Sequence, residues 1–138
     1  MLPIRVLVVE DFEPFRRFIC STLANNQDLQ VVCEVSDGQA AVLKARELKP
    51  DLILLDIGLP MLNGIAAARQ IRKLCPESKI IFVTQEFSDE IVQEALKLGA
   101  RGYVAKTKAG SDLLPAVEAV LEGRKFVSCA LQIPRVSV

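Results

Sequence analysis

The sequence has no histidine and no pair of cysteines at C-x-x-C spacing, since its four cysteines are scattered along the chain. Catalysis by histidine and zinc sites built from cysteine and histidine are therefore poor candidates. The chain also lacks an excess of charge of either sign, because 17 Lys and Arg residues balance 17 Asp and Glu residues. No net positive field is available to hold nucleic acid or an anionic membrane, so we expect no direct binding of nucleic acid.

Long apolar runs are absent as well. No stretch approaches the ~20 apolar residues that a membrane-spanning helix needs. The apolar stretch in the opening segment MLPIRVLVVED is too short for a secretory signal, and acidic residues follow it directly. We therefore expect a cytoplasmic protein with reduced thiols and no membrane partner. The patterns G-x-G-x-x-G and G-x-x-x-x-G-K-[ST] are missing too, which disfavours binding of flavin, NAD or nucleotide.

The composition that remains is that of an ordinary globular protein, with 51% hydrophobic and 25% charged residues. A length of 138 residues corresponds to one domain that is large enough to bury its own core. We expect this domain to occupy residues 1–123. Residues 124–138 are expected to form a C-terminal tail that is too short for a second domain.

Short apolar runs alternate with helical patterns along the whole domain. The runs are typical of buried strands and are bounded by turn residues; they occupy residues 4–9, 29–35, 52–55, 79–84 and 102–106. A helical pattern follows each run. The first pattern places four apolar residues on one stripe, namely Phe12, Phe15, Ile19 and Leu23. The last helix is expected to be capped by Ser111 and to end at Gly123.

Five consecutive strand and helix units predict a doubly wound α/β sandwich. Parallel strands need right-handed crossovers, and these crossovers place helices on both faces of a five-stranded parallel sheet. The expected strand order is 2-1-3-4-5, as in flavodoxin-like folds. In such a sheet, ligands bind beyond the carboxyl ends of the strands, so the residues at those ends are the candidates for function.

Polar and charged residues stand at four of these strand ends. Glu10 and Asp11 follow the first strand, Asp56 follows the third, Thr84 ends the fourth and Lys106 ends the fifth. Carboxylates this close together repel one another unless a cation lies among them, and a site of oxygen ligands suits Mg²⁺. The sequence therefore predicts a magnesium site formed by the three acids.

The same residues predict a nucleophile. Together with Mg²⁺, Lys106 would balance the three negative charges and allow a phosphoryl group to approach. Asp56 could then attack phosphorus and form an aspartyl phosphate, while Thr84 donates a hydrogen bond to a phosphoryl oxygen. Asp56, Thr84 and Lys106 are thus the candidate catalytic residues.

At these residues the chain resembles the receiver domain of two-component response regulators. The matching features are an acidic pair after the first strand, a D-x-x-x-P-x-x-x-G frame at Asp56, Pro60 and Gly64, a hydroxyl residue ending strand four and a lysine ending strand five. The resemblance covers residues 4 to about 123. The segments 38–57 and 99–128 are similar to receivers of LuxR-type (NarL/FixJ-like) regulators, which carry a DNA-binding part after the receiver. The resemblance leaves two expectations open, a stand-alone receiver or the front part of a longer DNA-binding regulator.

The resemblance implies further roles. The backbone carbonyl of Gly58 would be a metal ligand, and Tyr103 would be the aromatic residue that turns inward when phosphorylation draws Thr84 toward the phosphoryl group. The phosphodonor would be a histidine kinase or phosphotransfer protein, since this chain has no histidine. The chain would be a phosphorylation-activated switch with self-phosphorylation and autodephosphorylation, and not an enzyme that acts on other substrates. The face made by helix 88–99, strand 102–106 and helix 111–123 would form a homodimer or meet an output partner.

Two positions depart from the family pattern, and two other functions compete. Gln85 stands where receivers usually have a small residue, and Thr107 stands where they often have a cis proline. Gln85 alone favours a pseudo-receiver, an interaction module that takes no phosphate. A haloacid-dehalogenase-like phosphatase would need a second aspartate at position 58, where this sequence has glycine. Each site residue could also have a purely structural role, such as helix capping for Glu10 and Asp11. Only the placement of all these residues at one edge of the sheet favours the functional interpretation.

Overall fold

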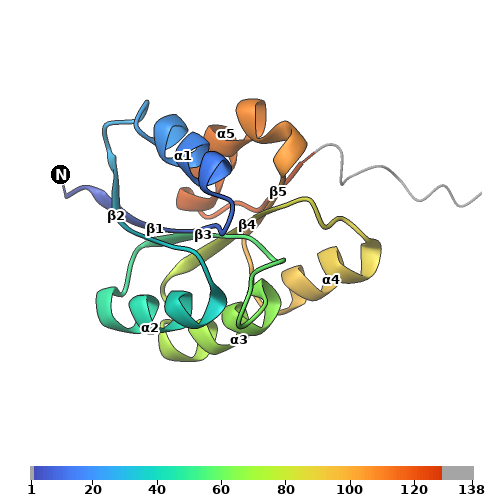
Figure 1. Ribbon diagram of the computed structural model, residues 1–138. Coiled ribbons are helices and arrows are strands. Elements are labelled where there is room, and N and C mark those ends of the chain that lie inside the picture. The colour runs from blue at the N-terminus through green and yellow to red at the C-terminus, as the bar shows by residue number, and fades with distance from the viewer. Residues whose placement is uncertain (1, 129–138) are drawn as a thin grey trace, which may run out of the picture.

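The strands and helices alternate as predicted and form one three-layered α/β domain (Figure 1). The computed structural model describes residues 2–128, so the part of the expected tail from 129 to 138 lies outside the described residues. The strands are β1 (Ile4–Val9), β2 (Leu29–Val35), β3 (Leu52–Leu55), β4 (Lys79–Thr84), β5 (Gly102–Ala105) and β6 (Phe126–Val127). The helices are α1 (Glu13–Leu23), α2 (Gly38–Leu48), α3 (Gly64–Leu74), α4 (Asp89–Lys97), the 3₁₀ turn η1 (Lys106–Lys108) and α5 (Ala109–Leu121).

The sheet is parallel throughout, with the strand order β2-β1-β3-β4-β5-β6. The predicted fold class and the order 2-1-3-4-5 are confirmed. The structure adds a sixth strand, because residues 126 and 127 of the expected tail pair in parallel with Gly102 and Tyr103 of β5. Among the described residues, β6 and not β5 is therefore the outermost strand on this side of the sheet, opposite β2.

The helices cover the two faces of the sheet unequally: α1 and α5 lie on one face, and α2, α3 and α4 lie on the other (Figure 1). Alternate residues along each strand supply the two cores. On β1, Val6 and Val8 join the core beneath α1 and α5, whereas Leu7 and Val9 join the core beneath the other three helices. The central strands are buried on both faces, which explains their continuous apolar runs.

Polar residues directly before three helices fix where those helices begin. The side chains of Asp37, Asn63 and Ser88 accept hydrogen bonds from backbone N–H groups in the first turns of α2, α3 and α4. Within residues 2–128, no helix combines the length and the apolar character needed to cross a membrane.

Two local predictions are wrong. Ser111 does not cap the last helix, because η1 runs directly into α5 and the helix begins at Ala109; the Ser111 hydroxyl instead donates to the carbonyl of Lys108. Phe12 is not on the buried stripe of α1, since it precedes the helix and is 61% exposed. Its neighbours Ile19 and Leu23 are buried as expected.

The loop after Asp56 is held by two glycines. The N–H of Gly38 donates to the carbonyl of Pro60 at 3.2 Å, and the N–H of Gly64 donates to the carbonyl of Ile57 at 2.7 Å. A Cβ atom on Gly64 would lie 2.0 Å from the carbonyl oxygen of Asp56. The glycine of the D-x-x-x-P-x-x-x-G frame thus lets α3 begin in contact with the backbone of Asp56.

Replacing Gly64 with alanine should therefore strain the backbone that carries Asp56. We expect the free energy of unfolding to fall by about 2–4 kcal/mol, because the clashing atoms are backbone and have little room to move. Urea denaturation measures the change. Gly58→Ala is the matched control in the same loop, since a Cβ there meets nothing within 4 Å. Equal stability of the two variants would contradict this explanation of the glycine.

Candidate functional site

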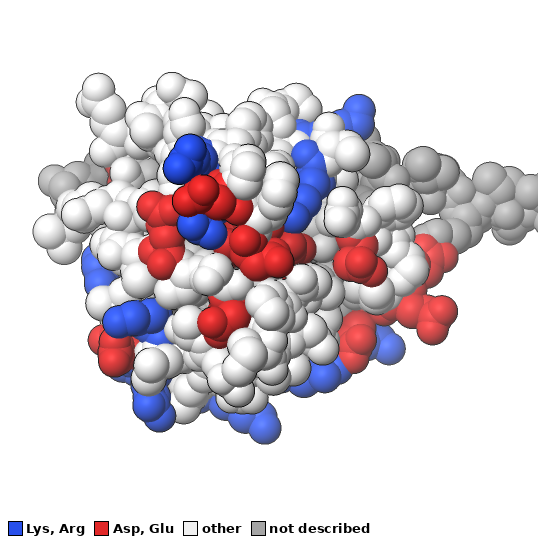
Figure 2. Space-filling view, in the orientation of Figure 1, with Lys and Arg blue, Asp and Glu red and all other residues white. Residues whose placement is uncertain are grey.

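The predicted site residues lie at the carboxyl edge of the sheet. Glu10 and Asp11 follow β1 and Asp56 follows β3, while Thr84 ends β4 and Lys106 directly follows β5. β1, β3, β4 and β5 are consecutive neighbours in the sheet, so their ends converge. A cleft of ≈ 500 Å³ opens here, and its lining includes the side chains of Asp11, Asp56, Thr84 and Lys106. Figure 2 shows acidic side chains gathered near the centre of the face in view, with basic side chains around them.

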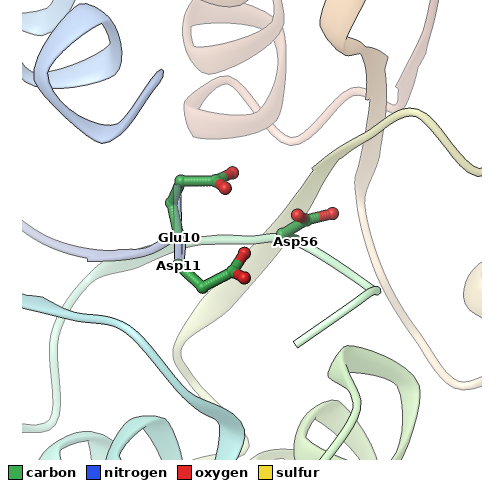
Figure 3. Close-up of side chains that lie close together, drawn as sticks. All are labelled: Glu10, Asp11 and Asp56. Atoms are coloured by element: carbon green, nitrogen blue, oxygen red, sulfur yellow. The ribbon is translucent and has the colours of Figure 1, made fainter. Parts of the chain in front are cut away.

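Glu10, Asp11 and Asp56 form one acidic cluster. One carboxylate oxygen from each residue lies within 4.8 Å of the oxygens of the other two. Figure 3 shows Glu10 and Asp11 side by side after β1 and Asp56 at the end of the neighbouring strand, with the three carboxyl groups oriented toward the same side. Glu10 is fully buried and Asp56 is 6% exposed, whereas Asp11 is exposed. The cluster therefore reaches from the interior of the domain to its surface.

Lys106 supplies the cation nearest to the buried acids. Its Nζ lies 3.0 Å from Oδ2 of Asp56 and 3.0 Å from Oε1 of Glu10, and it donates to Oε2 of Glu10 at 3.1 Å. The same ammonium group lies 4.9 Å from the centre of the Phe15 ring, which adds a cation–π contact. One lysine thus joins the ends of β1, β3 and β5.

The two oxygens of Glu10 are held differently. Oε2 accepts hydrogen bonds from the N–H of Phe12 at 3.0 Å and from Lys106. Oε1 is close to the ammonium group but is buried without a hydrogen bond from any described residue. Its nearest cation is the Lys106 ammonium group, 3.0 Å away, so this oxygen is stabilised by an ion pair and not by a well-aligned hydrogen bond.

Burial and pairing shift two pKa values in this cluster. Burial of Glu10 raises the pKa of its carboxyl, although the hydrogen bonds from Phe12 and Lys106 oppose the shift. Burial tends to lower the pKa of Lys106, but its hydrogen bonds to Asp56 and Glu10 outweigh burial and raise this pKa. The lysine therefore stays charged at neutral pH.

Thr84 and Tyr103 are joined through Glu86. Oγ1 of Thr84 accepts a hydrogen bond from the N–H of Glu86 at 3.1 Å, and the Tyr103 hydroxyl donates to the carbonyl of the same residue. Tyr103 is fully buried. Burial, together with the nearby acidic charges of Glu86 and Asp56, raises the pKa of its hydroxyl, so this group remains a donor at neutral pH. The loop after β4 is thereby tied to the side chain of Tyr103.

The structure also shows contributors that the sequence did not reveal. Phe15 was expected only as a core residue, yet its ring lies against Lys106. Arg16 donates to the backbone carbonyl of Glu10 at 2.9 Å and pairs with Glu34 at 3.3 Å. A position six residues after Glu10 on the first turn of a helix could have suggested this contact, but the sequence cannot give the direction of the side chain.

Gly58 and Gln85 line the cleft as well. Gly58 lies on an exposed part of the loop after Asp56, and Gln85 is exposed directly after Thr84. Gln85 is therefore at the rim of the site and does not fill its interior.

An acidic cluster bridged by a lysine at the strand ends of this fold defines a class of signalling domain. The response regulator receiver domain model matches residues 6–118. This chain therefore belongs to the receiver domains of two-component response regulators, which are signalling domains and bind Mg²⁺ in an acidic pocket.

Individual relatives support this family assignment. The response regulator protein VraR of Staphylococcus epidermidis is 39% identical over 122 residues, which are 88% of this chain and 58% of the relative. A LuxR-family two-component response regulator from Aurantimonas has a TM-score of 0.89 at 30% identity over 94% of this chain and 93% of that one. The isolated receiver of RcsB from Salmonella enterica, solved with the phosphomimetic BeF₃⁻, has a TM-score of 0.88 at 25% identity over 94% of this chain and 96% of that one. The chain thus spans little more than half the length of VraR.

Replacing Lys106 with methionine should leave Glu10 and Asp56 without their nearest cation. We expect the free energy of unfolding at pH 7 without Mg²⁺ to fall by about 3 kcal/mol, because two buried carboxylates remain unpaired. The pKa of Glu10 is raised in the folded protein, so the folded protein binds a proton at Glu10 more readily than the unfolded chain does. Glu10 therefore favours folding at low pH, and this contribution is lost as the pH rises through the folded-state pKa. The deficit of the variant should therefore shrink as the pH falls.

Urea denaturation of both proteins across the acidic and neutral range measures this effect. Lys108→Met is the matched control, since Lys108 is exposed on the same 3₁₀ turn and its replacement should change stability by less than about 0.5 kcal/mol. A deficit for Lys106→Met that is the same at every pH would contradict the assignment of Lys106 as the partner of the buried acids.

Proposed function

We propose that this receiver domain accepts a phosphoryl group on Asp56 in a Mg²⁺-dependent reaction and thereby acts as a signalling switch. The observation that carries the proposal is the position of Asp56. Its carboxylate is nearly buried, lies 3.0 Å from Lys106 and within 4.8 Å of two further carboxylates, and faces a cleft that opens to solvent. A carboxylate used only for structure would not need an acidic cluster beside it.

The residues present fit a magnesium ion. The donor set consists of oxygens only, and one of them, Oε1 of Glu10, is buried without a hydrogen bond in the described part of the chain. Glu10, Asp11, Asp56 and the backbone carbonyl of Gly58 would hold the ion, with waters completing its shell. When bound, Mg²⁺ supplies positive charge that offsets the acids and the phosphoryl oxygens.

The chain's own residues then divide the chemistry. A carboxylate oxygen of Asp56 attacks phosphorus, an O–P bond forms, and the bond from phosphorus to the donor breaks with its electron pair leaving on the donor. The Lys106 ammonium, already 3.0 Å from Asp56, stabilises the negative charge of the transferred group. Thr84 Oγ1 accepts from Glu86, which leaves the hydroxyl proton to donate to a phosphoryl oxygen.

The phosphodonor is proposed to be a histidine kinase or phosphotransfer protein, with which receivers of this family interact. The chain contains no histidine and cannot supply the phosphohistidine itself. Its own catalysis would be limited to its phosphorylation and to hydrolysis of the aspartyl phosphate. A location in the cytoplasm, where histidine kinases present their phosphohistidine, is part of this proposal.

No second function is favoured. A haloacid-dehalogenase-like mechanism lacks its general acid, because the residue two positions after Asp56 is Gly58. The pseudo-receiver reading depended on Gln85 narrowing the site, and this side chain is exposed at the rim of the cleft.

Phosphorylation would be transmitted through Thr84, the 84–86 loop and Tyr103. The hydrogen bonds at Glu86 connect a residue facing the phosphoryl site to a residue buried beside α4 and β6. The homodimer expected at the face of α4, β5 and α5 would form with β6 at its centre, since β6 covers the edge of β5. Direct contact with nucleic acid is not proposed for this chain, whose charges balance; such a role would belong to a further part of a longer parent protein.

Asp56→Asn should abolish Mg²⁺-dependent labelling by acetyl phosphate, as measured by intact-mass spectrometry. Removal of the nucleophilic oxygen prevents the phosphoryl ester from forming. Asp51→Asn is the control, because Asp51 is an exposed aspartate just before the same strand and accepts a hydrogen bond from the N–H of Arg5. Equal labelling of wild type and Asp56→Asn, or no labelling of wild type, would refute the proposed function.

Tyr103→Phe separates the switch from the chemistry. The variant keeps the buried ring but loses the hydrogen bond to the carbonyl of Glu86. We expect the rate of Asp56 labelling to stay within about threefold of wild type, while phosphorylation-linked dimerisation weakens by roughly tenfold. Analytical ultracentrifugation with and without acetyl phosphate measures the dimer. Unchanged phosphorylation-linked dimerisation would show that the signal does not pass through this hydroxyl.

A further inference from the structure

The segment after α5 binds the end of β5 that carries Lys106. The N–H of Ser128 donates to the carbonyl of Tyr103 at 2.9 Å, and the Ser128 hydroxyl oxygen accepts a hydrogen bond from the N–H of Ala105 at 3.0 Å. Ala105 is the last residue of β5 and directly precedes Lys106. A side chain from outside the predicted domain thus completes the backbone hydrogen bonding of the strand at the residue before the lysine.

The two residues of β6, directly before Ser128, pack against the two cores of the domain. Phe126 packs against the core beneath α1 and α5, and Val127 packs against the core on the opposite face of the sheet. Ser128 itself is 0% exposed, although Arg124 and Lys125 just before the strand are exposed. The two residues before Ser128 are therefore packed against both cores.

The position of Lys106 depends on the backbone that Ser128 binds. The Lys106 ammonium must reach Asp56 and Glu10 at 3.0 Å each, from the first residue of a 3₁₀ turn. A catalytic group must be held within about 0.5 Å of its productive position for full effect. A shift of the Ala105–Lys106 peptide would move the ammonium group relative to the carboxylate that attacks phosphorus.

We propose that Ser128 is a positioning residue of the phosphoryl site: by accepting the hydrogen bond of Ala105, it fixes the end of β5 and with it the distance from Lys106 to Asp56. This inference rests on the proposed phosphorylation of Asp56. It assigns residues 126–128 to the working receiver and not to a tail.

The test compares three variants of the full chain with wild type. Ser128→Ala removes the accepting oxygen, and Ser128→Thr keeps it. Ser78→Ala is the control, because Ser78 is another buried serine with a hydrogen bond to the backbone. Its hydroxyl donates to the carbonyl of Pro50, and it precedes β4 at the amino end of the strands, away from the site. The rate of Asp56 labelling by acetyl phosphate, the Mg²⁺ affinity and the thermal midpoint are measured for each protein.

We expect Ser128→Ala to slow labelling roughly three- to tenfold, as loss of a hydrogen bond that positions a catalytic group should. Ser78→Ala and Ser128→Thr should stay within about twofold of wild type, and Mg²⁺ affinity should be unchanged within about twofold in all variants. An unchanged rate in Ser128→Ala, an equal slowing in Ser78→Ala or a threonine variant as slow as the alanine variant would overturn the inference. Wild type that is not labelled at Asp56 would instead overturn the proposed function.

A second measurement needs no folded variant of Ser128. NMR spectra of wild type with Mg²⁺, before and after addition of the phosphoryl mimic BeF₃⁻, report on the amides of Ala105 and Ser128. Because coupling between two sites is reciprocal, we expect both resonances to shift on BeF₃⁻ binding while that of Ser78 does not. Shifts around Asp56 without any at Ala105 and Ser128 would contradict a positioning role for Ser128.

Discussion

The central interaction of this receiver is the contact of one ammonium group with two buried carboxylates. Lys106 pairs with Glu10 and Asp56 at 3.0 Å each and so connects the ends of three strands. Burial of the two acids would be costly without this partner, and replacing Lys106 alone would leave two carboxylates without their nearest cation. The strands deliver their polar ends to one edge because they are parallel, so the fold itself brings the repelling acids together. The site therefore holds mutually repelling carboxylates next to one cation that offsets part of their charge, and the proposed phosphoryl transfer would depend on the same balance of charge.

The surrounding structure serves to keep this edge in place. Gly64 allows the backbone of Asp56 to contact the start of α3, and Arg16 binds the backbone carbonyl of Glu10. On the other side, the loop after β4 is tied to Tyr103 through Glu86, and β5 is held by Ser128. Each of these contacts involves backbone at or beside a site residue. These contacts are the route by which the proposed phosphorylation of Asp56 would reach β5 and β6.

The fold class and the convergence of the site residues at one edge of the sheet could be predicted from the sequence. The features that could not be predicted have physical explanations. Buried parallel strands give continuous apolar runs with a polar residue at each end, so Asp56 and Lys106 were visible as strand ends. The two-residue strand β6 has no periodicity to recognise, and Ser128 is a single polar residue whose burial depends on tertiary pairing. Phe12 fits the helical stripe by spacing, but the helix begins after it. Ser111 is a residue type that often caps helices, but η1 leads directly into α5, which begins at Ala109, two residues before Ser111.

The central claim is that the acids at the sheet edge tolerate one another because cations lie among them, Lys106 in the protein and Mg²⁺ from solution. An NMR titration of the wild-type chain with Mg²⁺ tests this claim most directly. The claim predicts saturable shifts of the amides of Glu10, Asp11, Asp56 and Gly58, which disappear when Asp11 is replaced by asparagine. Absence of these shifts at saturating Mg²⁺, or their persistence in the Asp11→Asn variant, would contradict it.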